Sequence, residues 1–295
     1  MDVITLSGGL GNQMFQYALY YVKNPKTKSY LSLYFLNREQ SHNGYELDSV
    51  FNIFIQKKWL VDLFVRIIRK LLIFSKNIIV RLFFRFLDSL GIHLIQEPKN
   101  GVFQSIALQN KNGINFYLGC WYSEKYFIKQ ENDIRKLFTF DLQKLNRKSK
   151  FILNTIKKEN SISLHIRRGD FLTNGNYNIL GNVCTVDYYK RAAEYIVKQV
   201  KCPFFFVFSD DINWVKSNIM FSHPTYYIDW NTGLNSWQDM FLMSACKHNI
   251  IANSTFSWWG AWLNAYNDKI VVRPSSMLKD IFCPDAFPET WLSID

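Results

Sequence analysis

The stretch that decides the fold is CKHNIIANSTFSWWGAWLN, residues 246–264. It predicts the end of a helix, a short buried strand over 249–253, a polar turn at Ser254 and Thr255, and a second helix that opens at Phe256. Free backbone N–H groups and the positive end of the helix dipole make such a helix start suitable for an anion. Taken alone, the stretch fits a capping serine and core tryptophans at least as well.

The composition indicates a packed globular protein with an anionic partner. A chain of 295 residues, 48% hydrophobic and 17% aromatic, is long enough for two domains with substantial cores. A formal net charge of +11 favours phosphate, nucleic acid or a membrane surface as partner. Five cysteines without a CxxC pair favour reduced thiols in the cytosol, and the opening MDVITLSGG does not resemble a signal peptide.

The N-terminal part predicts a strand over 3–6, a glycine loop over 8–13 and a helix that Asn24 and Pro25 end early. A strand, a glycine loop and a helix in this order are typical of nucleotide-binding α/β units, because glycine lets the backbone approach a ligand. A plain tight turn explains the loop equally well, since it matches neither the dinucleotide fingerprint nor a P-loop. A second strand is expected over 30–36.

Residues 57–95 differ from the rest because basic and apolar side chains alternate at three- and four-residue spacing, which predicts basic amphipathic helices, two in number. No apolar run approaches the roughly 20 residues that a membrane-spanning helix needs. Two interpretations stay open: helices lying on an anionic membrane surface, or a helical hairpin packed on its own domain. The basic residues concerned are Arg66, Arg69, Lys70, Arg81 and Arg85.

The second half alternates strands and helices, which predicts a doubly wound parallel sheet with ligands at the carboxyl ends of its strands. A lysine-rich stretch over 143–158 is the candidate boundary between domains 1–150 and 151–295. Thr185 is expected to cap one helix, and Ser236 with Asp239 is expected to form a capping box for another. The strands are expected over 162–166, 204–208, 226–228, 250–252 and 270–272.

Two adjacent arginines leave the first of these strands in HIRRGD, residues 165–170. Buried or half-buried arginines are costly unless they meet anions or carboxylates, and a guanidinium suits a pair of phosphate oxygens. The alternative is a structural ion pair with Asp170, which we expect for one of Arg167 and Arg168.

A carboxylate pair, Asp210 and Asp211 of FSDD, follows the next strand. These side chains suit a metal, the hydroxyls of a ribose or the N–H edge of a guanine, whereas capping of the following helix is the more natural role for Asp211. With the turn of NSTFSWW, three strand ends offer arginine, carboxylate and N–H groups. Together they predict a nucleotide-diphosphate site.

GGLGNQMFQYA, YELDSVFNI, GCWYSEKYF, HIRRGD, FSDD and CKHNIIANSTFSWWGAWLN occur in the order seen in bacterial α-1,2-fucosyltransferases of glycosyltransferase family eleven. The chain resembles this family nearly throughout, apart from 57–95, and HIRRGD also resembles the HxRRxD motif of other fucosyltransferases. The resemblance implies an α/β fold of the GT-B type: two Rossmann-like domains facing a cleft, here with a helical insertion in the N-terminal half. Tyr122 and Phe171 stand where the family usually has Gln and Tyr, which bears on the acceptor more than on the chemistry.

The resemblance also implies roles for individual residues. Arg167 would clamp the β-phosphate of the donor, with Arg168 and Asp170 bracing the motif. Arg167 and Asp170 are thus the candidate catalytic residues, although arginines beside Asp170 favour its ionised form and make it a weak general base. The remaining GDP-fucose contacts implied are Asn12 near the phosphate and sugar, His165 with Asp210 or Asp211 near the guanosine, and Asn253, Ser254, Thr255 and Phe256 at the diphosphate.

The implied reaction is inverting transfer of L-fucose from GDP-β-L-fucose to the 2-hydroxyl of a galactoside in a surface glycan such as a lipopolysaccharide O-antigen. It would need no metal or other cofactor and would take place in the cytoplasm, with the protein either free or peripheral at the inner face of the cytoplasmic membrane. Domain 1–150 would receive the acceptor, an oligosaccharide or a lipid-linked glycan. Domain 151–295 would bind the GDP-fucose, with a C-terminal tail able to pack back on the first domain.

A fucosyltransferase of another linkage and a non-catalytic nucleotide-binding protein remain as alternatives. A glycosidase needs two carboxylates across a sugar from each other, which the adjacent Asp210 and Asp211 cannot provide. No motif that reads RNA or DNA accompanies the basic residues, so nucleic acid is not expected as a partner.

Overall fold

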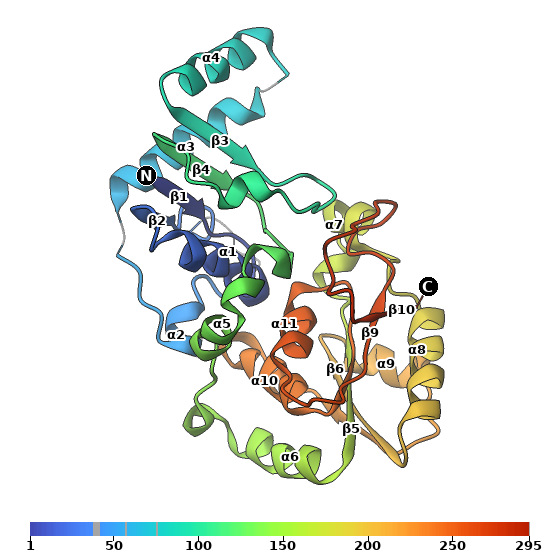
Figure 1. The fold of residues 1–295 in the computed structure, drawn as a ribbon. Helices are drawn as coiled ribbons and strands as arrows, with labels where there is room; N and C mark the ends of the chain where they lie inside the picture. The colour runs from blue at the N-terminus through green and yellow to red at the C-terminus, as the bar shows by residue number, and fades with distance from the viewer. Residues whose placement is uncertain (38–41, 57, 75, 295) are drawn as a thin grey trace. The chain divides into compact units, whose positions relative to one another are not determined.

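The computed structural model describes residues 1–37, 42–56, 58–74 and 76–294, which form two compact units, Met1–Thr139 and Phe140–Asp295. Each unit is built on its own parallel β-sheet (Figure 1). The α/β class, with two units built on parallel sheets and a helical insertion in the N-terminal half, is therefore confirmed. The second unit begins at Phe140, before the boundary expected at residue 150, so the lysine-rich stretch is a helix of the second unit, α6 (Arg147–Lys158).

The first unit has a four-stranded sheet with the order β2-β1-β4-β3. Strand β1 (Asp2–Thr5) is buried and pairs in parallel on both sides, with Val3 opposite Tyr30 of one neighbour and Phe116 of the other. The expected strand over 30–36 ends at Ser32, and a turn follows. The strands are β1 (Asp2–Thr5), β2 (Ser29–Ser32), β3 (Ile92–Gln96) and β4 (Ile114–Leu118).

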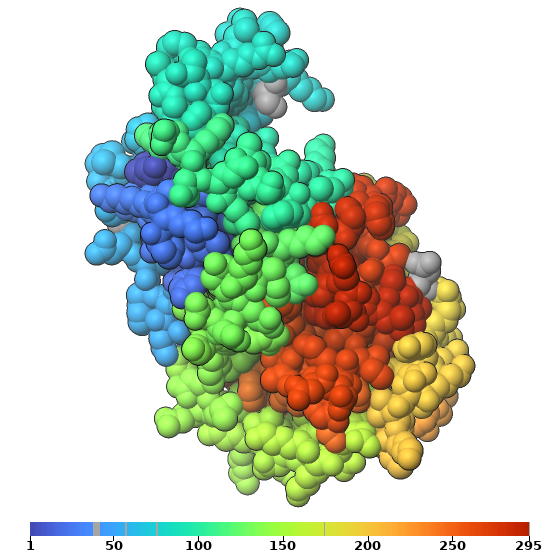
Figure 2. Space-filling model, viewed as in Figure 1, coloured from blue at the N-terminus to red at the C-terminus, as the bar shows by residue number. Residues whose placement is uncertain are grey.

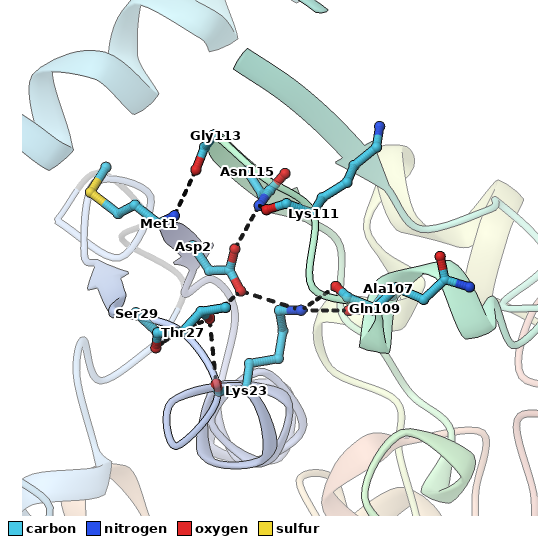
Figure 3. A network of polar contacts seen from close by, with 10 residues as sticks. All are labelled: Met1, Asp2, Lys23, Thr27, Ser29, Ala107, Gln109, Lys111, Gly113 and Asn115. Atoms are coloured by element: carbon cyan, nitrogen blue, oxygen red, sulfur yellow. Dashed lines mark hydrogen bonds and ion pairs between the residues drawn. The ribbon is translucent and has the colours of Figure 1, made fainter. Parts of the chain in front are cut away.

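The helix after the glycine loop ends at Lys23, as Asn24 and Pro25 predict, and an ion pair fixes this end. The Lys23 ammonium lies 3.2 Å from Asp2 Oδ2 at the start of β1, and both side chains are almost fully buried. It also donates to the carbonyl oxygens of Ala107 and Gln109 (Figure 3). The helices of the first unit are α1 (Leu10–Lys23), α2 (Leu47–Phe51), α3 (Trp59–Ile73), α4 (Ile78–Ser89) and α5 (Glu131–Leu137), with short 3₁₀ turns η1 (Ser105–Leu108), η2 (Glu124–Tyr126) and η3 (Ile128–Gln130).

The segment 57–95 contains two helices, α3 and α4, as predicted, and then runs into β3. Val61, Val65 and Ile68 of α3 pack on the sheet residues Val3 and Phe116. Residues spaced by three and four positions share one face of a helix, so this stripe is the inner face of α3.

The second unit has a six-stranded parallel sheet with the order β10-β9-β8-β5-β6-β7, which confirms the doubly wound prediction. Helices α8 and α9 pack Tyr188, Ile196 and Val215 into a core against one face of this sheet, and α6, α10 and α11 lie on the other side (Figure 1). The strands are β5 (Asn160–Ile166), β6 (Pro203–Ser209), β7 (Thr225–Ile228), β8 (His248–Ile250), β9 (Val271–Pro274) and β10 (Leu292–Ile294). The remaining helices are α7 (Asn174–Leu180), α8 (Val186–Gln199), α9 (Ile212–Asn218), α10 (Trp237–Ala245) and α11 (Thr255–Leu263), with 3₁₀ turns η4 (Leu142–Lys144), η5 (Asp170–Leu172) and η6 (Gly233–Asn235).

The helix caps that the sequence predicts in the second unit are present, with one exception. Thr185 accepts from the N–H of Tyr188, as predicted. The capping box at Ser236 is wrong: the turn η6 runs directly into α10, so Ser236 already has helical dihedrals and its side chain caps nothing. Asp239 instead accepts from Asn231 Nδ2 at 2.7 Å, and burial raises the pKa of this carboxyl to about 8.

Candidate active site

The carboxyl ends of three neighbouring strands carry the motifs that the sequence singled out. Strands β8, β5 and β6 lie side by side, and the chain runs from β5 to β6 and β7 before it crosses to β8 on the other side of β5. The edge between β5 and β8 is therefore a topological switch point, where open parallel sheets bind ligands. Arg167 follows β5, Asp210 follows β6 and Ser254 follows β8, so the prediction that these motifs share one edge is confirmed.

Arg167 is held by two carboxylates. Its Nε and Nη2 atoms lie 2.9 and 2.8 Å from Oδ1 of Asp170, and its Nη1 lies 3.0 Å from Oδ2 of Asp210. The expected ion pair between one arginine of the motif and Asp170 is thus present. These contacts use three of the five N–H groups of a guanidinium. The guanidinium carbon of Arg167 lies 5.8 Å from the centre of the Phe171 ring.

Arg168 faces a different set of groups. Its Nε lies 3.2 Å from Oδ2 of Asp211, and its guanidinium carbon lies 3.5 Å from the centre of the Trp214 ring. The other carboxylate oxygen of Asp211 accepts from Trp214 N–H and caps α9, which is the role expected for that residue. The guanidinium of Arg168 therefore interacts with groups of the protein itself, the Asp211 carboxylate and the Trp214 ring. The stacking on Trp214 is a contact that the sequence analysis missed, although Trp214 lies only three residues beyond Asp211.

Asp210 connects the two strand ends. Its Oδ1 accepts from the backbone N–H of Arg168 at 2.9 Å while its Oδ2 contacts Arg167. This approach requires a residue without a side chain at position 169, because a Cβ on Gly169 would lie 2.7 Å from Asp210 Oδ2. The glycine of HIRRGD is thus explained by packing.

The charges at this edge do not form a cationic patch. Two arginines and three aspartates (Arg167, Arg168, Asp170, Asp210 and Asp211) give a formal sum of 2 − 3 = −1. An anion would therefore be bound by directed N–H groups rather than by an excess of positive charge. In the described residues there is no group of three or more His, Cys, Asp or Glu side chains that could hold a metal.

His165 is buried at the end of β5, with 5% of its surface exposed, and its Nδ1 has no hydrogen-bond partner in the described part of the chain. Its ring lies 5.8 Å from that of Phe256 in the first turn of α11. Burial, and secondarily the charge of Arg167, lower its pKa to about 3, so the imidazole is neutral at physiological pH. A buried polar atom without a partner is costly, which points to a ligand or water at this position.

The start of α11 supplies N–H groups next to His165. Ser254 is the N-cap and accepts from the N–H of Phe256 at 3.3 Å. Ser257 donates to the carbonyl of Ser254 and fixes this turn from within the helix. Thr255 and Phe256 are half-buried. The nine-residue helix thus presents its positive end at the switch point.

The side-chain amide of Asn253 is engaged within the protein. It is buried, and its Nδ2 donates to the carbonyl oxygens of Leu180 and Met277 at 3.0 and 3.1 Å. Both hydrogens of the amide are used in these bonds. Asn253 therefore ties the end of α7 and the loop after β9 to the strand end.

Asn12 is the one predicted contact that belongs to the first unit, where it lies in the first turn of α1. Gly8 has a positive φ of 72°, and a Cβ there would collide with the Asn12 amide, so both conformation and space require glycine. Gln13 donates to the carbonyls of Gly8 and Gly44 and holds the loop from the side.

Two further groups at the carboxyl edge of the first sheet escaped the sequence analysis. Glu97, after β3, accepts from the N–H groups of Cys120 and Tyr122 and fixes the turn after β4. His42 lies against the glycine loop, because a Cβ on Gly9 would be 3.3 Å from its Nδ1. Both contacts join residues far apart in the sequence, by 23 and 25 positions for Glu97 and by 42 − 9 = 33 for His42 and Gly9, which hid them.

Comparison with known proteins agrees with these motifs. The model of the family described as Glycosyl transferase family 11 matches residues 98–295. An alpha-1,2-colitosyltransferase of Escherichia coli is 34% identical to this chain, over 99% of this chain and 98% of that protein. The O-antigen biosynthesis glycosyltransferase WbnK of Escherichia coli is 38% identical, over 91% of this chain and 92% of that protein.

A mammalian protein is related over a shorter range. The galactoside alpha-(1,2)-fucosyltransferase 1 of Saimiri boliviensis boliviensis is 26% identical, over 58% of this chain and 50% of that protein. The family model covers both HIRRGD and NSTFSWW, and two bacterial relatives align with almost the whole chain. The chain belongs to glycosyl transferase family 11.

Proposed function

We propose that the protein is an inverting α-1,2-fucosyltransferase that moves L-fucose from GDP-β-L-fucose to the 2-hydroxyl of a galactoside in a surface glycan such as an O-antigen. The observation that carries the proposal is the edge formed by β5, β6 and β8, where a guanidinium held by two carboxylates lies at the same switch point as a helix N-terminus. Membership of the family and the names of its relatives support the reaction class.

The first requirement of this reaction is stabilisation of the leaving group, GDP. In an in-line displacement, positive charge develops on the sugar while negative charge develops on GDP. In the proposal, the remaining N–H groups of Arg167 and the first turn of α11 meet that negative charge. Groups that are already oriented need little reorganisation as the charge forms, which makes this the largest catalytic contribution expected here.

The roles of the other charged residues follow from their contacts. Asp170 and Asp210 hold the guanidinium of Arg167, and Asp211 holds Arg168. With these carboxylates engaged by arginines, the neutral His165 is the better placed group for a nucleoside contact. We propose Asp170 as a brace rather than as the general base, because its carboxylate holds both Nε and Nη2 of Arg167.

Colitose is the specific alternative to fucose as the transferred sugar, because a full-length relative carries the name alpha-1,2-colitosyltransferase. Colitose lacks the 3-hydroxyl of fucose. A site that hydrogen-bonds this hydroxyl would reject the deoxy sugar strongly, by as much as about 10⁴-fold. The two donors are therefore separable by a direct comparison of rates.

We place this reaction in the cytoplasm, with the first unit receiving the acceptor glycan and the second unit the donor, and without a metal. All five cysteines are free thiols, which suits a reducing compartment.

The experiment is a turnover screen of the purified chain with GDP-fucose, GDP-colitose and UDP-galactose on several β-galactosides, with the product linkage read by NMR. We expect an α-1,2-linked fucosyl product. Turnover with GDP-colitose alone would show that colitose, not fucose, is the transferred sugar. A product with another linkage would show that a hydroxyl other than the 2-hydroxyl is the acceptor. GDP binding without turnover on any acceptor would favour a non-catalytic nucleotide-binding protein.

A further inference from the structure

Helices α3 and α4 expose an unusual number of large apolar side chains. Single exposed apolar residues are ordinary on soluble proteins, but a dense group of them marks an interaction surface. The exposed residues are Trp59, Leu60, Leu63, Phe64, Ile67, Ile73, Phe74, Ile78, Ile79, Leu82, Phe83, Phe86 and Leu90.

Helix α3 has two apolar stripes. The inner stripe of Val61, Val65 and Ile68 packs on the sheet. A second stripe, which includes Leu63, Phe64 and Ile67, lies on another face and remains 40–54% exposed. One stripe is enough to attach a helix to its own domain, so the second stripe has no structural task within the first unit.

Helix α4 is more extreme, because none of its side chains is buried. Its outer stripe recurs at spacings of three and four residues, from Ile79 through Leu82, Phe83 and Phe86 to Leu90, and every member is exposed. The helix follows α3 and precedes β3 at one end of the first unit (Figure 1), and its atoms project from the surface there (Figure 2).

The segment that carries these stripes also has an excess of basic side chains. Residues 58–74 and 76–90 contain seven basic residues and two acidic ones, a formal sum of 7 − 2 = +5. The acidic residue Asp62 is already used, because it accepts from Ser32 Oγ at 2.6 Å. The basic residues are Lys58, Arg66, Arg69, Lys70, Lys76, Arg81 and Arg85.

We propose that the outer stripes of α3 and α4 form a docking surface for an anionic lipid bilayer. In this arrangement the apolar side chains enter the boundary between headgroups and acyl chains, while long arginine and lysine side chains of the same segment reach lipid phosphates. A second copy of the chain is a poorer occupant, since its identical charge of +5 would face that of the first. None of the helices in the described part of the chain combines the length and apolarity needed to span a bilayer.

The inference is independent of the proposed donor and acceptor, because it rests on α3 and α4 alone. The consequence for the enzyme would be a glycan acceptor held at the membrane, where the first unit could reach it. Surface attachment by several basic residues, each contributing roughly 1 kcal/mol, is reversible and depends on salt.

The test is flotation of the whole chain with vesicles of neutral phosphatidylcholine, with and without anionic phosphatidylglycerol. We expect binding to the anionic vesicles at low salt, little binding to the neutral ones, and release at 1 M salt, where the screening length falls to about 3 Å. Arg81→Gln with Arg85→Gln should weaken binding about thirty-fold, from roughly 1 kcal/mol for each charge removed.

A matched pair of variants tests the apolar stripe. Ile79→Ser with Phe86→Ser should weaken vesicle binding at least tenfold, whereas Met220→Ser with Phe282→Ser, residues of the second unit that are more exposed still, should leave it unchanged. Thermal unfolding of each variant checks that the fold is kept. Failure of the wild-type chain to float with anionic vesicles at low salt overturns the proposal. So does a dimer that the Ile79 and Phe86 variant dissociates while vesicle binding persists.

Discussion

Nη1 of Arg167 lies 3.0 Å from Oδ2 of Asp210, across the boundary between two adjacent strands. The other oxygen of the same carboxylate accepts from the backbone N–H of Arg168. One side chain from the end of β6 therefore fixes both the backbone and the guanidinium of the motif that follows β5. With Asp170 on its other edge, Arg167 is oriented before any ligand arrives, as electrostatic catalysis requires.

Replacement of this guanidinium by an ammonium tests its geometry rather than its charge. Arg167→Lys keeps the positive charge but loses the planar, two-pronged arrangement of donors. We expect turnover to fall on the order of 10²-fold, because the contact strengthens as GDP departs. Arg191→Lys is the control, since Arg191 pairs with Asp187 on the exposed side of α8. Turnover of Arg167→Lys within a few-fold of wild type would refute the bidentate role.

Asp210 should act as a positioning residue for Arg167. Asp210→Asn keeps an oxygen for the N–H of Arg168 but removes the charge that holds Arg167, so we expect kcat to fall by roughly ten-fold or more with KM changed less. Asp211→Asn is the matched control, because asparagine also caps helices and the cap of α9 survives. Equal losses in the two variants would contradict a specific link between Asp210 and Arg167.

The buried His165 predicts a particular dependence of stability on pH. Its pKa is about 3 in the folded protein against 6.5 when unfolded. Between these values only the unfolded chain takes up the proton, so this contribution to stability is complete above pH 6.5 and is lost as the pH falls towards 3.

From pH 7 to pH 5, the free energy of unfolding of the wild type should therefore fall by about 2 kcal/mol more than that of His165→Gln. Denaturant unfolding at the two pH values measures the difference. Parallel losses in the two proteins would show that His165 is protonated in the folded state.

The sequence predicted where the motifs lie better than which residues they contact. Strand ends at HIRRGD, FSDD and NSTFSWW could be located because apolar runs and helix caps are local signals. The pairing of Arg167 with Asp210 could not, since it depends on β6 being the neighbour of β5. The buried pair of Lys23 and Asp2 could not be predicted either, because it depends on how the end of α1 packs against the start of β1.

One error arose from a local pattern that the surrounding structure overrides. The spacing of Ser236 and Asp239 fits a capping box, but the preceding 3₁₀ turn makes Ser236 helical. Contacts of Asn253 also went unpredicted, since its amide donates to two carbonyls from distant loops. A pattern of residue types does not reveal hydrogen bonds that the chain satisfies from elsewhere.

The proposed chemistry assigns the stabilisation of the leaving group to Arg167 and the N-terminus of α11. If these groups suffice, excess EDTA should leave the rate of transfer unchanged, and added Mn²⁺ should not raise it. Loss of activity in EDTA with recovery in Mn²⁺ would overturn this part of the mechanism.

Titration calorimetry of the whole chain with GDP and UDP tests the central claim most directly, namely that the edge of β5, β6 and β8 is a guanosine-diphosphate site. The diphosphate is common to both nucleotides, so a difference in affinity reports the contact to the base. We predict that GDP binds at least about tenfold more tightly, the equivalent of one or two net hydrogen bonds. Equal binding of the two nucleotides, or tighter binding of UDP, would contradict the account.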